Sequence, residues 1–384
     1  ITKAFSFKNI KAVLLLVNSP GGSPVQSALI ANRICELSKE KEVPVYCFIE
    51  DLAASGGYWL SCAADKVYAM ESSIIGSIGV ISSGFGAVEA LKKLGIERRV
   101  YSEGKNKGLL FGIPVLLKDN IDTHDKMPTT AGSFALENNF PERDSEVAHR
   151  LREAGVVLLG KANLSQFAGF RNTASFNGST VGGSPKNPYD TTRSPAGSSS
   201  GSGVATAMSF AAATIGTETG GSIVGPSSVN GIVGMKPTIA LVSRRGIVPI
   251  SLNQDSSGPM TRSVADAAMI LDVIAGTDPE DPWSKDADRH LQSYTNALDS
   301  NALQGTRVGV IQPPESDTDG VLDLFEAALK VLTAEGAQLV TIPADELVDP
   351  RPEMRTILLQ DFKVDLNAYL ETTPNSVDVR TLAD

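Results

Sequence analysis

Two segments rich in glycine and serine bracket a run of small apolar residues in the second half of this 384-residue chain. The first, called here the serine-rich segment, covers residues 194–203 and reads SPAGSSSGSG. The second covers residues 216–222 and reads GTETGGS. The run between them, residues 204–213, suits a buried helix, which predicts two serine-bearing turns whose hydroxyl groups meet in space. By composition alone the serine-rich segment is also typical of a flexible linker, so both interpretations stay open.

An apolar strand that ends in a lysine precedes these turns. Residues 112–120 read GIPVLLKDN, with Lys118 directly after the aliphatic run. A lysine there is either a surface residue at a strand end or a partly buried amine whose lowered pKa suits it to act as a base. A helix over 144–154 and a strand over 156–159 follow, and this alternation predicts an α/β fold. A desolvated lysine beside two serines would supply a Ser-Ser-Lys proton relay without histidine.

These stretches resemble the amidase signature family. The resemblance covers about residues 109–384 and includes GIVGMKPT (231–238), GPMTRSVA (258–265) and FKVDLNAYL (362–370). Within that family the chain looks most like the peptide amidases, on the stretches KDNIDT, GTETGGSIV and SLNQDSSGPM. The resemblance implies an α/β/α domain with a mixed sheet. It also implies a hydrolase that cleaves the C–N bond of carboxamides, with peptide amides as one substrate class.

The resemblance also assigns catalytic roles residue by residue. Lys118 is the base, Ser198 is the bridging serine held by a cis peptide bond, and Ser222 is the nucleophile that forms an acyl-enzyme. The family's oxyanion hole corresponds to the backbone N–H groups of Thr219, Gly220, Gly221 and Ser222. Lys161 and Lys236 lie in other family motifs and are interpreted as structural.

The first 108 residues carry a separate pattern. An aliphatic run over 12–17, helically spaced apolar residues over 30–37 and a strand over 43–49 predict a β-turn-α-β unit whose first strand is buried on both faces. The stretches NSPGG (18–22), AASGGY (53–58), GSIGV (76–80) and SEGKNK (102–107) resemble the S49 peptidases, the signal peptide peptidase family. That resemblance implies a crotonase-like or ClpP-like fold, and oligomer contacts through this segment.

The S49 resemblance implies a second serine-lysine site. Ser55 corresponds to the nucleophile and Lys107 to the base, with Lys105 as a near rival, while Gly22 and Gly56 would supply oxyanion N–H groups. The segment contains no histidine, so a Ser-His-Asp triad is excluded there. We therefore expect an S49-like domain over 1–108 and an amidase signature domain over 109–384, the first truncated and the second incomplete at both ends.

Composition limits the partners. The net charge of −10, the 6% aromatic content and the absence of a basic cluster argue against nucleic acid. Three cysteines cannot make a disulfide framework, and three widely spaced histidines make a zinc site improbable, so we expect neither metal nor cofactor. No aliphatic run is long enough to span a bilayer and no signal peptide is visible, so a cytoplasmic location is the default expectation.

The main prediction is an amidase acting on a small-molecule or peptide amide. The first alternative is an S49-type peptidase that uses Ser55 and Lys107. A second is an inactive chimeric or misassembled fusion, or a scaffold that keeps the folds without catalysis. A third is a glutamine-dependent amidotransferase subunit, which shares the amidase signature fold and requires partner chains.

Overall fold

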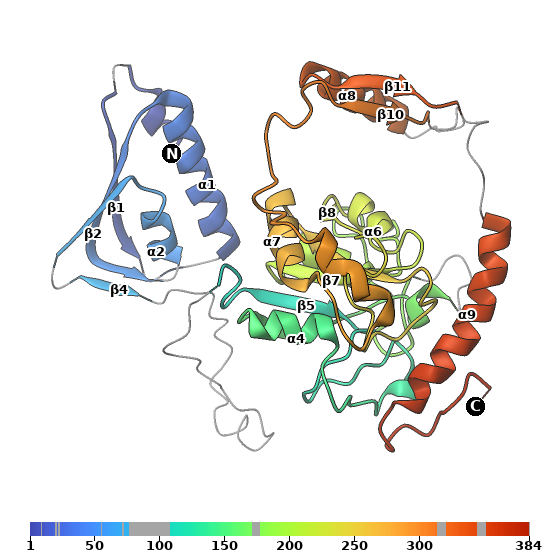
Figure 1. The fold of residues 1–384 in the computed structure, drawn as a ribbon. Helices are drawn as coiled ribbons and strands as arrows, with labels where there is room; N and C mark the ends of the chain where they lie inside the picture. The colour runs from blue at the N-terminus through green and yellow to red at the C-terminus, as the bar shows by residue number, and fades with distance from the viewer. Residues whose placement is uncertain are drawn as a thin grey trace. The chain divides into compact units, whose positions relative to one another are not determined.

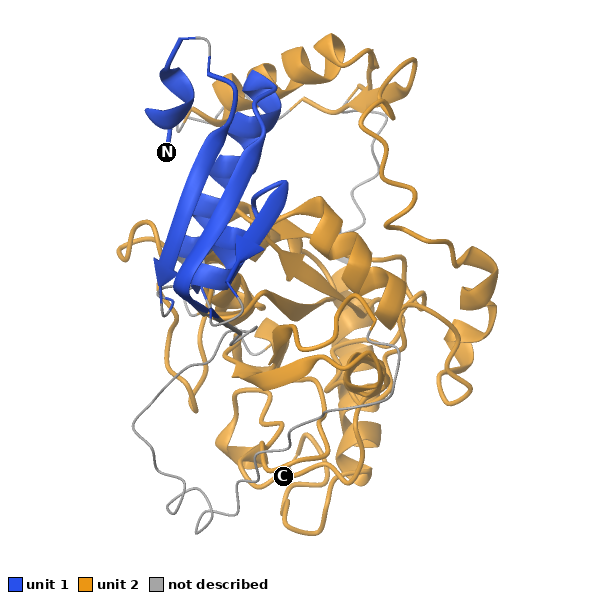
Figure 2. Cartoon of the chain, turned by 90° about the vertical axis from the view of Figure 1, so that its left-hand side faces the viewer, with its two compact units in different colours: residues 1–105 blue, residues 106–384 orange. Residues whose placement is uncertain are grey.

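The computed structural model of the chain divides into two compact units, residues 1–105 and residues 106–384, coloured separately in Figure 2. The structure describes residues 1–8, 10–19, 21, 24–54, 56–70, 73–76, 108–170, 177–312, 320–343 and 351–383. Both units combine parallel strands with helices, which confirms the predicted α/β class.

The first unit is built on a parallel sheet with strand order β1-β2-β3, and β4 pairs with the last residues of β2. Strands β1, β2 and β4 are labelled in Figure 1. Helix α1 packs against this sheet because Ile34 and Leu37 lie one helical turn apart and meet Val13 and Val45 in one apolar cluster. The elements are η1 (Ala4–Ser6), β1 (Val13–Ser19), α1 (Pro24–Lys41), β2 (Val45–Ala54), α2 (Gly56–Ser61), β3 (Lys66–Ala69) and β4 (Ile74–Gly76), where η marks a 3-10 turn.

Strand β1 differs from its prediction in one respect. Val13 and Val17 are buried, but Leu14 and Leu16 are 62% and 71% exposed. Successive strand residues point to opposite faces, and the apolar clusters of the described residues in this unit contain Val13 and Val17 but neither Leu14 nor Leu16. The expectation of burial on both faces was therefore wrong, because a continuous aliphatic run does not reveal how many layers cover a sheet.

The second unit contains a five-stranded mixed sheet with strand order β6-β5-β7-β9-β8. Strands β6, β5 and β7 are parallel, and β9 runs antiparallel to both β7 and β8. The sheet strands are β5 (Pro114–Lys118), β6 (Val157–Ala162), β7 (Ala213–Glu218), β8 (Val233–Gly234) and β9 (Ser256–Thr261). The helices beside them are α4 (Glu146–Glu153), α5 (Ser200–Ala207), α6 (Val224–Val229) and α7 (Val264–Ile274).

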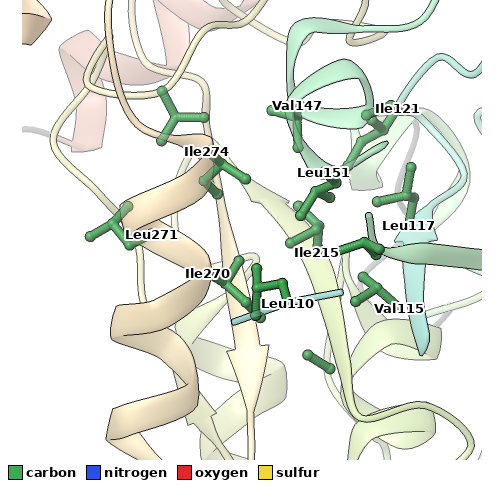
Figure 3. Packing of buried hydrophobic residues seen from close by; sticks show 14 of the residues in the cluster. Leu110, Val115, Leu117, Ile121, Val147, Leu151, Ile215, Ile270, Leu271 and Ile274 are labelled. Atoms are coloured by element: carbon green, nitrogen blue, oxygen red, sulfur yellow. The ribbon is translucent and has the colours of Figure 1, made fainter. Parts of the chain in front are cut away.

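Side chains along β5 and β7 point alternately to the two faces of the sheet, and each face packs against different helices. Leu117 and Ile215 point into an apolar core that they share with Leu151 of α4 and Ile270 of α7 (Figure 3). Helix α5 packs on the other face through small polar contacts, such as the 3.0 Å hydrogen bond between the hydroxyl groups of Thr206 and Thr214. Small side chains on α5 allow it to lie close to the sheet.

The remaining elements follow the sheet in sequence. Strands β10 (Arg307–Val310) and β11 (Gln338–Thr341) form a separate parallel pair connected through α8 (Val321–Ala334). Helix α9 (Arg351–Glu371) packs through Phe362, Leu366 and Leu370 into a second apolar cluster, where Phe362 stacks on Phe170 with ring centroids 4.1 Å apart. The described part of the unit also contains three 3-10 turns: η2 (Phe134–Leu136), η3 (Gln166–Gly169) and η4 (Pro282–His290).

Replacing Leu117 with alanine should destabilise the second unit by about 2–5 kcal/mol, because the side chain is fully buried and its loss leaves a cavity. Urea unfolding followed by fluorescence measures this in a Trp59→Phe background, where Trp283 becomes the sole tryptophan. Leu159→Ala on β6 is the matched control, since this leucine is half-exposed. Equal losses from both substitutions would contradict the assigned core.

Candidate active site

Lys118 ends strand β5 and is completely buried. Its Nζ donates a hydrogen bond to Ser198 Oγ at 2.8 Å. It also reaches the hydroxyl and the carbonyl oxygen of Thr217, at 2.8 Å and 3.0 Å. The interpretation of Lys118 as a surface residue at a strand end is therefore wrong. The amine lies at the carboxyl end of a parallel strand, where α/β folds place their ligand sites.

The surroundings of Lys118 favour its neutral form. Burial lowers the pKa of Lys118 to about 7, because the charged ammonium loses its hydration. The carboxylates of Asp255 and Glu218 oppose this effect and raise the pKa. An amine with a pKa of about 7 is partly unprotonated at neutral pH and can accept a proton, which an ordinary surface lysine cannot do efficiently.

The serine-rich segment is a packed part of the fold. Ser198, Ser199, Ser200 and Ser202 are all buried, and α5 begins at Ser200. The peptide bond between Gly197 and Ser198 is cis. The linker interpretation is therefore wrong. The expected helix over 204–213 instead ends at Ala207, ahead of Ser209, whose φ of 58° is left-handed.

The glycine-rich turn, residues 219–222, follows strand β7 and is held by a carboxylate. Glu218 accepts hydrogen bonds from the backbone N–H groups of Gly221, Ile223 and Val224, at 2.8, 2.6 and 2.9 Å. Gly221 has a φ of 84°, a conformation that side-chain-bearing residues rarely adopt. Glu218 was not among the predicted site residues, although its position inside the GTETGGS stretch was a signal for it.

Backbone contacts bring the two serine-bearing turns together. The N–H of Ser199 donates to the carbonyl oxygen of Ser222 at 3.2 Å, and the Ser199 hydroxyl donates to Thr217 O at 3.1 Å. Ser222 itself is buried at the end of the glycine-rich turn. Lys118 and Ser198 are thus in direct contact, and the segment of Ser222 runs beside that of Ser198.

Two further polar residues form hydrogen bonds with threonines of this site. Asn120 donates from Nδ2 to Thr217 Oγ1 at 3.1 Å and to Val248 O at 3.2 Å. Asp255 accepts a short hydrogen bond from the hydroxyl of Thr219, and burial raises its pKa to about 6. Sequence reasoning missed both residues, although each lies inside a stretch that carried the family resemblance. Neither stretch indicated toward which end of the sheet the side chain of Asn120 or Asp255 would point.

Lys161 and Lys236 contact other groups. Lys161 donates to Ile121 O and, at 2.8 Å, to Thr129 Oγ1, while burial lowers its pKa. Lys236 donates to the adjacent Pro237 O at 3.3 Å. These contacts are compatible with the structural roles predicted for both lysines.

The predicted site of the first segment lies largely outside the described residues. Ser55, Lys107 and Gly22 all fall there. Gly56 is described, and it begins helix α2 as a buried residue. The serine-lysine pair of this segment therefore stays a prediction.

A cavity of about 670 Å³ lies elsewhere in the second unit. Its lining includes Asp122, Arg244, Trp283 and Tyr369, but not the three predicted catalytic side chains. Within the described ranges, no group of three or more His, Cys, Asp or Glu side chains could hold a metal ion. None of the helices in those ranges is long and apolar enough to cross a membrane.

Gly201→Ala should destabilise the second unit by about 1–3 kcal/mol or more. Gly201 lies in the first turn of α5, and an added Cβ would come within 2.4 Å of the backbone oxygen of Asn163, which cannot move aside cheaply. Gly225→Ala in α6 is the matched control, because a Cβ there meets open space and alanine favours a helix. Urea unfolding in the Trp59→Phe background compares them. An unchanged stability for Gly201→Ala would contradict the close contact between α5 and Asn163.

Two family models match the chain. The amidase model matches residues 86–381, and the model of peptidase family S49 matches residues 37–126. The matched ranges overlap over residues 86–126. The second match agrees with the predicted S49 resemblance of the N-terminal segment.

Similar proteins point to the same family. A probable amidase of Arabidopsis thaliana is 45% identical over 286 residues, which are 72% of this chain and 54% of that protein. One component of the glutamyl-tRNA(Gln) amidotransferase of Thermoanaerobacter pseudethanolicus is 42% identical over 235 residues, or 61% and 46% of the two chains.

A solved structure supports the likeness in fold. Native peptide amidase from Stenotrophomonas maltophilia is 41% identical with a TM-score of 0.65, and the match covers 77% of this chain and 58% of that one. The chain spans about half the length of the curated relatives it matches. Because the amidase model covers well over half of its residues, the chain belongs to the amidase family.

Proposed function

We propose that this chain hydrolyses the C–N bond of carboxamides through Lys118, Ser198 and Ser222. The observation that carries the proposal is the 2.8 Å contact between a fully buried lysine amine and Ser198 Oγ, with the lysine pKa lowered to about 7. A buried amine in contact with a hydroxyl group is the acceptor that a serine relay needs when no histidine takes part.

The proposed proton path starts at this contact. Neutral Lys118 accepts the proton of Ser198 Oγ, and Ser198 in turn takes the proton of Ser222 Oγ. Ser222 then attacks the amide carbonyl carbon and forms the tetrahedral intermediate. The proton returns through Ser198 to the leaving nitrogen, the C–N bond breaks, and the acyl group stays on Ser222. Water uses the same relay to release the carboxylic acid.

The glycine-rich turn would stabilise the negative charge on the carbonyl oxygen. The N–H of Gly221 already donates to Glu218, so we assign the oxyanion hole chiefly to the N–H groups of Thr219, Gly220 and Ser222. Gly221 would act by holding the turn in shape. Preorganised N–H donors of this kind stabilise a developing oxyanion without reorganising during the reaction.

Peptide amides are the substrate class that we propose. The likeness to peptide amidase over 77% of this chain supports this choice. The relatives also include the glutamyl-tRNA(Gln) amidotransferase component, so glutamine is the competing substrate. Ammonia release from glutamine that requires added partner chains would favour that alternative.

A second activity is favoured by the S49 model match over residues 37–126. We propose a crotonase-like fold for this segment, with Ser55 as nucleophile, Lys107 as base, and Gly22 and Gly56 as oxyanion donors. The parallel sheet of the first unit, with α1 packed on one face, supports such a fold.

Ser222→Ala should abolish ammonia release from a peptide with a C-terminal carboxamide, by roughly 10⁴-fold or more, because the nucleophile is lost. It should also abolish labelling of the second unit by a fluorophosphonate probe, followed by mass spectrometry. Ser228→Ala, an exposed serine on α6, is the control and should keep both. Labelling that survives Ser222→Ala but disappears in Ser55→Ala would favour the S49-type peptidase. A chain with no reactive serine would favour the inactive fusion or scaffold.

The value of kcat/KM should fall tenfold per pH unit below about pH 7. Lys118 has a pKa of about 7, and its protonated form cannot accept a proton from Ser198. Initial rates between about pH 5 and about pH 9 on the same peptide amide measure this acidic limb. Lys118→Met should lose activity across that range. An acidic limb near pH 4 would instead indicate a carboxylate base and would contradict the lysine assignment.

A further inference from the structure

Asp255 is a buried carboxylate that the proposed reaction does not use. It directly precedes β9, whose first residue Ser256 pairs with Glu218 at the end of β7. This antiparallel register places Asp255 beside the start of the glycine-rich turn. Its side chain is therefore held next to the proposed site by sheet pairing between segments far apart in sequence.

Three donors occupy the Asp255 carboxylate. The hydroxyl of Thr219 donates to Oδ1, and the backbone N–H groups of Ile250 and Ser251 donate to Oδ2 at 2.9 Å and 3.1 Å. Only 6% of the residue is exposed. The carboxylate thus connects Thr219, the first residue of the glycine-rich turn, to the 250–251 loop through hydrogen bonds. Hydrogen bonds to an ionised carboxylate are stronger than those between neutral groups.

Asp255 lines the same small cavity as Thr217, a hydrogen-bond partner of Lys118, and acts electrostatically on that lysine. It is the largest electrostatic influence that opposes the lowered pKa of Lys118, followed by Glu218. In return, Lys118 opposes the burial that raises the pKa of Asp255 to about 6. The two carboxylates differ in their contacts, because Glu218 accepts three backbone N–H groups whereas Asp255 holds a side-chain hydroxyl of the turn.

We propose that Asp255 is a positioning residue of the amidase site: it fixes Thr219 within the oxyanion turn, and it places its negative charge in the small cavity that Thr217, a hydrogen-bond partner of Lys118, also lines. This inference rests on the proposed function. It assigns two separable effects to one side chain. The hydrogen bond acts on kcat through the shape of the turn, and the charge acts on the pH at which Lys118 becomes neutral.

Two substitutions separate these effects. Asp255→Asn removes the charge but keeps a polar group of the same size that can pair with Thr219 and the 250–251 loop. Losing a nearby negative charge makes Lys118 neutral at lower pH, so the acidic limb of kcat/KM should move down by about half a pH unit or more. Thr219→Val keeps the charge and removes the hydroxyl. At about pH 9, well above the Asp255 pKa of about 6, it should lower kcat roughly tenfold with KM unchanged.

Asp122→Asn is the matched control. Asp122 is a second buried carboxyl group with a raised pKa, but it accepts from Tyr369 and lies among the charges around Lys161. Its substitution should leave the limb in place. A purely structural role for Asp255 would lower activity at every pH without moving the limb, and an unmoved limb in Asp255→Asn would overturn the charge effect. An unchanged kcat in Thr219→Val would overturn the positioning effect.

A measurement without turnover distinguishes this inference from the proposed function. NMR titration of the chain labelled with ¹³Cε-lysine follows Lys118 directly, and the spectrum of Lys118→Arg assigns its signal. We expect a lower titration midpoint in Asp255→Asn than in the unaltered chain. A shifted midpoint without any hydrolysis would keep the electrostatic effect of Asp255 on Lys118 and reject the amidase proposal. Hydrolysis with an unshifted midpoint would reject the role of Asp255 and keep the amidase.

Discussion

The burial of one lysine amine determines the chemistry available to the second unit. Lys118 has no exposed surface, and its partners are the hydroxyl groups of Ser198 and Thr217 and a backbone carbonyl. None of these partners is a carboxylate in direct contact, so the ammonium receives no full compensation for its lost hydration. Part of the amine is therefore neutral near pH 7 and able to accept a proton from a neighbouring hydroxyl group.

The candidate site is formed by local sequence motifs and by strand pairing between distant segments. Only the motifs could be predicted from the sequence. Lys118 and Ser198 lie in stretches whose composition and family resemblance predicted a contact between them, 80 positions apart. Asp255 reaches the glycine-rich turn only because β9 pairs antiparallel with β7. Sequence patterns do not specify such a register, so that carboxylate was missed. Glu218 was missed for a different reason: the GTETGGS stretch was expected to be a turn, where a glutamate ordinarily faces solvent, whereas Glu218 ends strand β7 and is buried.

The fold shows the same division between local and non-local information. The α/β class followed from the spacing of apolar residues, and the expected strands of both units are present. Exposure of Leu14 and Leu16 did not follow, because the number of layers on a sheet depends on segments elsewhere in the chain. The serine-rich segment shows the opposite case. Its composition suggests a linker, yet contacts with Asn163 and Ser165 bury it.

A comparison of the two buried lysines shows how the proposed base differs from the lysine predicted to be structural. Lys161 lies among Asp119 and Asp122, and its Nζ donates to a backbone carbonyl and a threonine hydroxyl. Burial lowers the pKa of both lysines, so the shift alone does not distinguish them. The difference lies in the partner: Lys118 contacts a serine whose backbone neighbour, Ser199, is bonded to the segment of Ser222. In the proposed relay, a proton accepted by Lys118 comes from the Ser198 hydroxyl, which is next in sequence to Ser199 and so close to the segment of Ser222, whereas the threonine hydroxyl beside Lys161 donates a hydrogen bond to a backbone carbonyl.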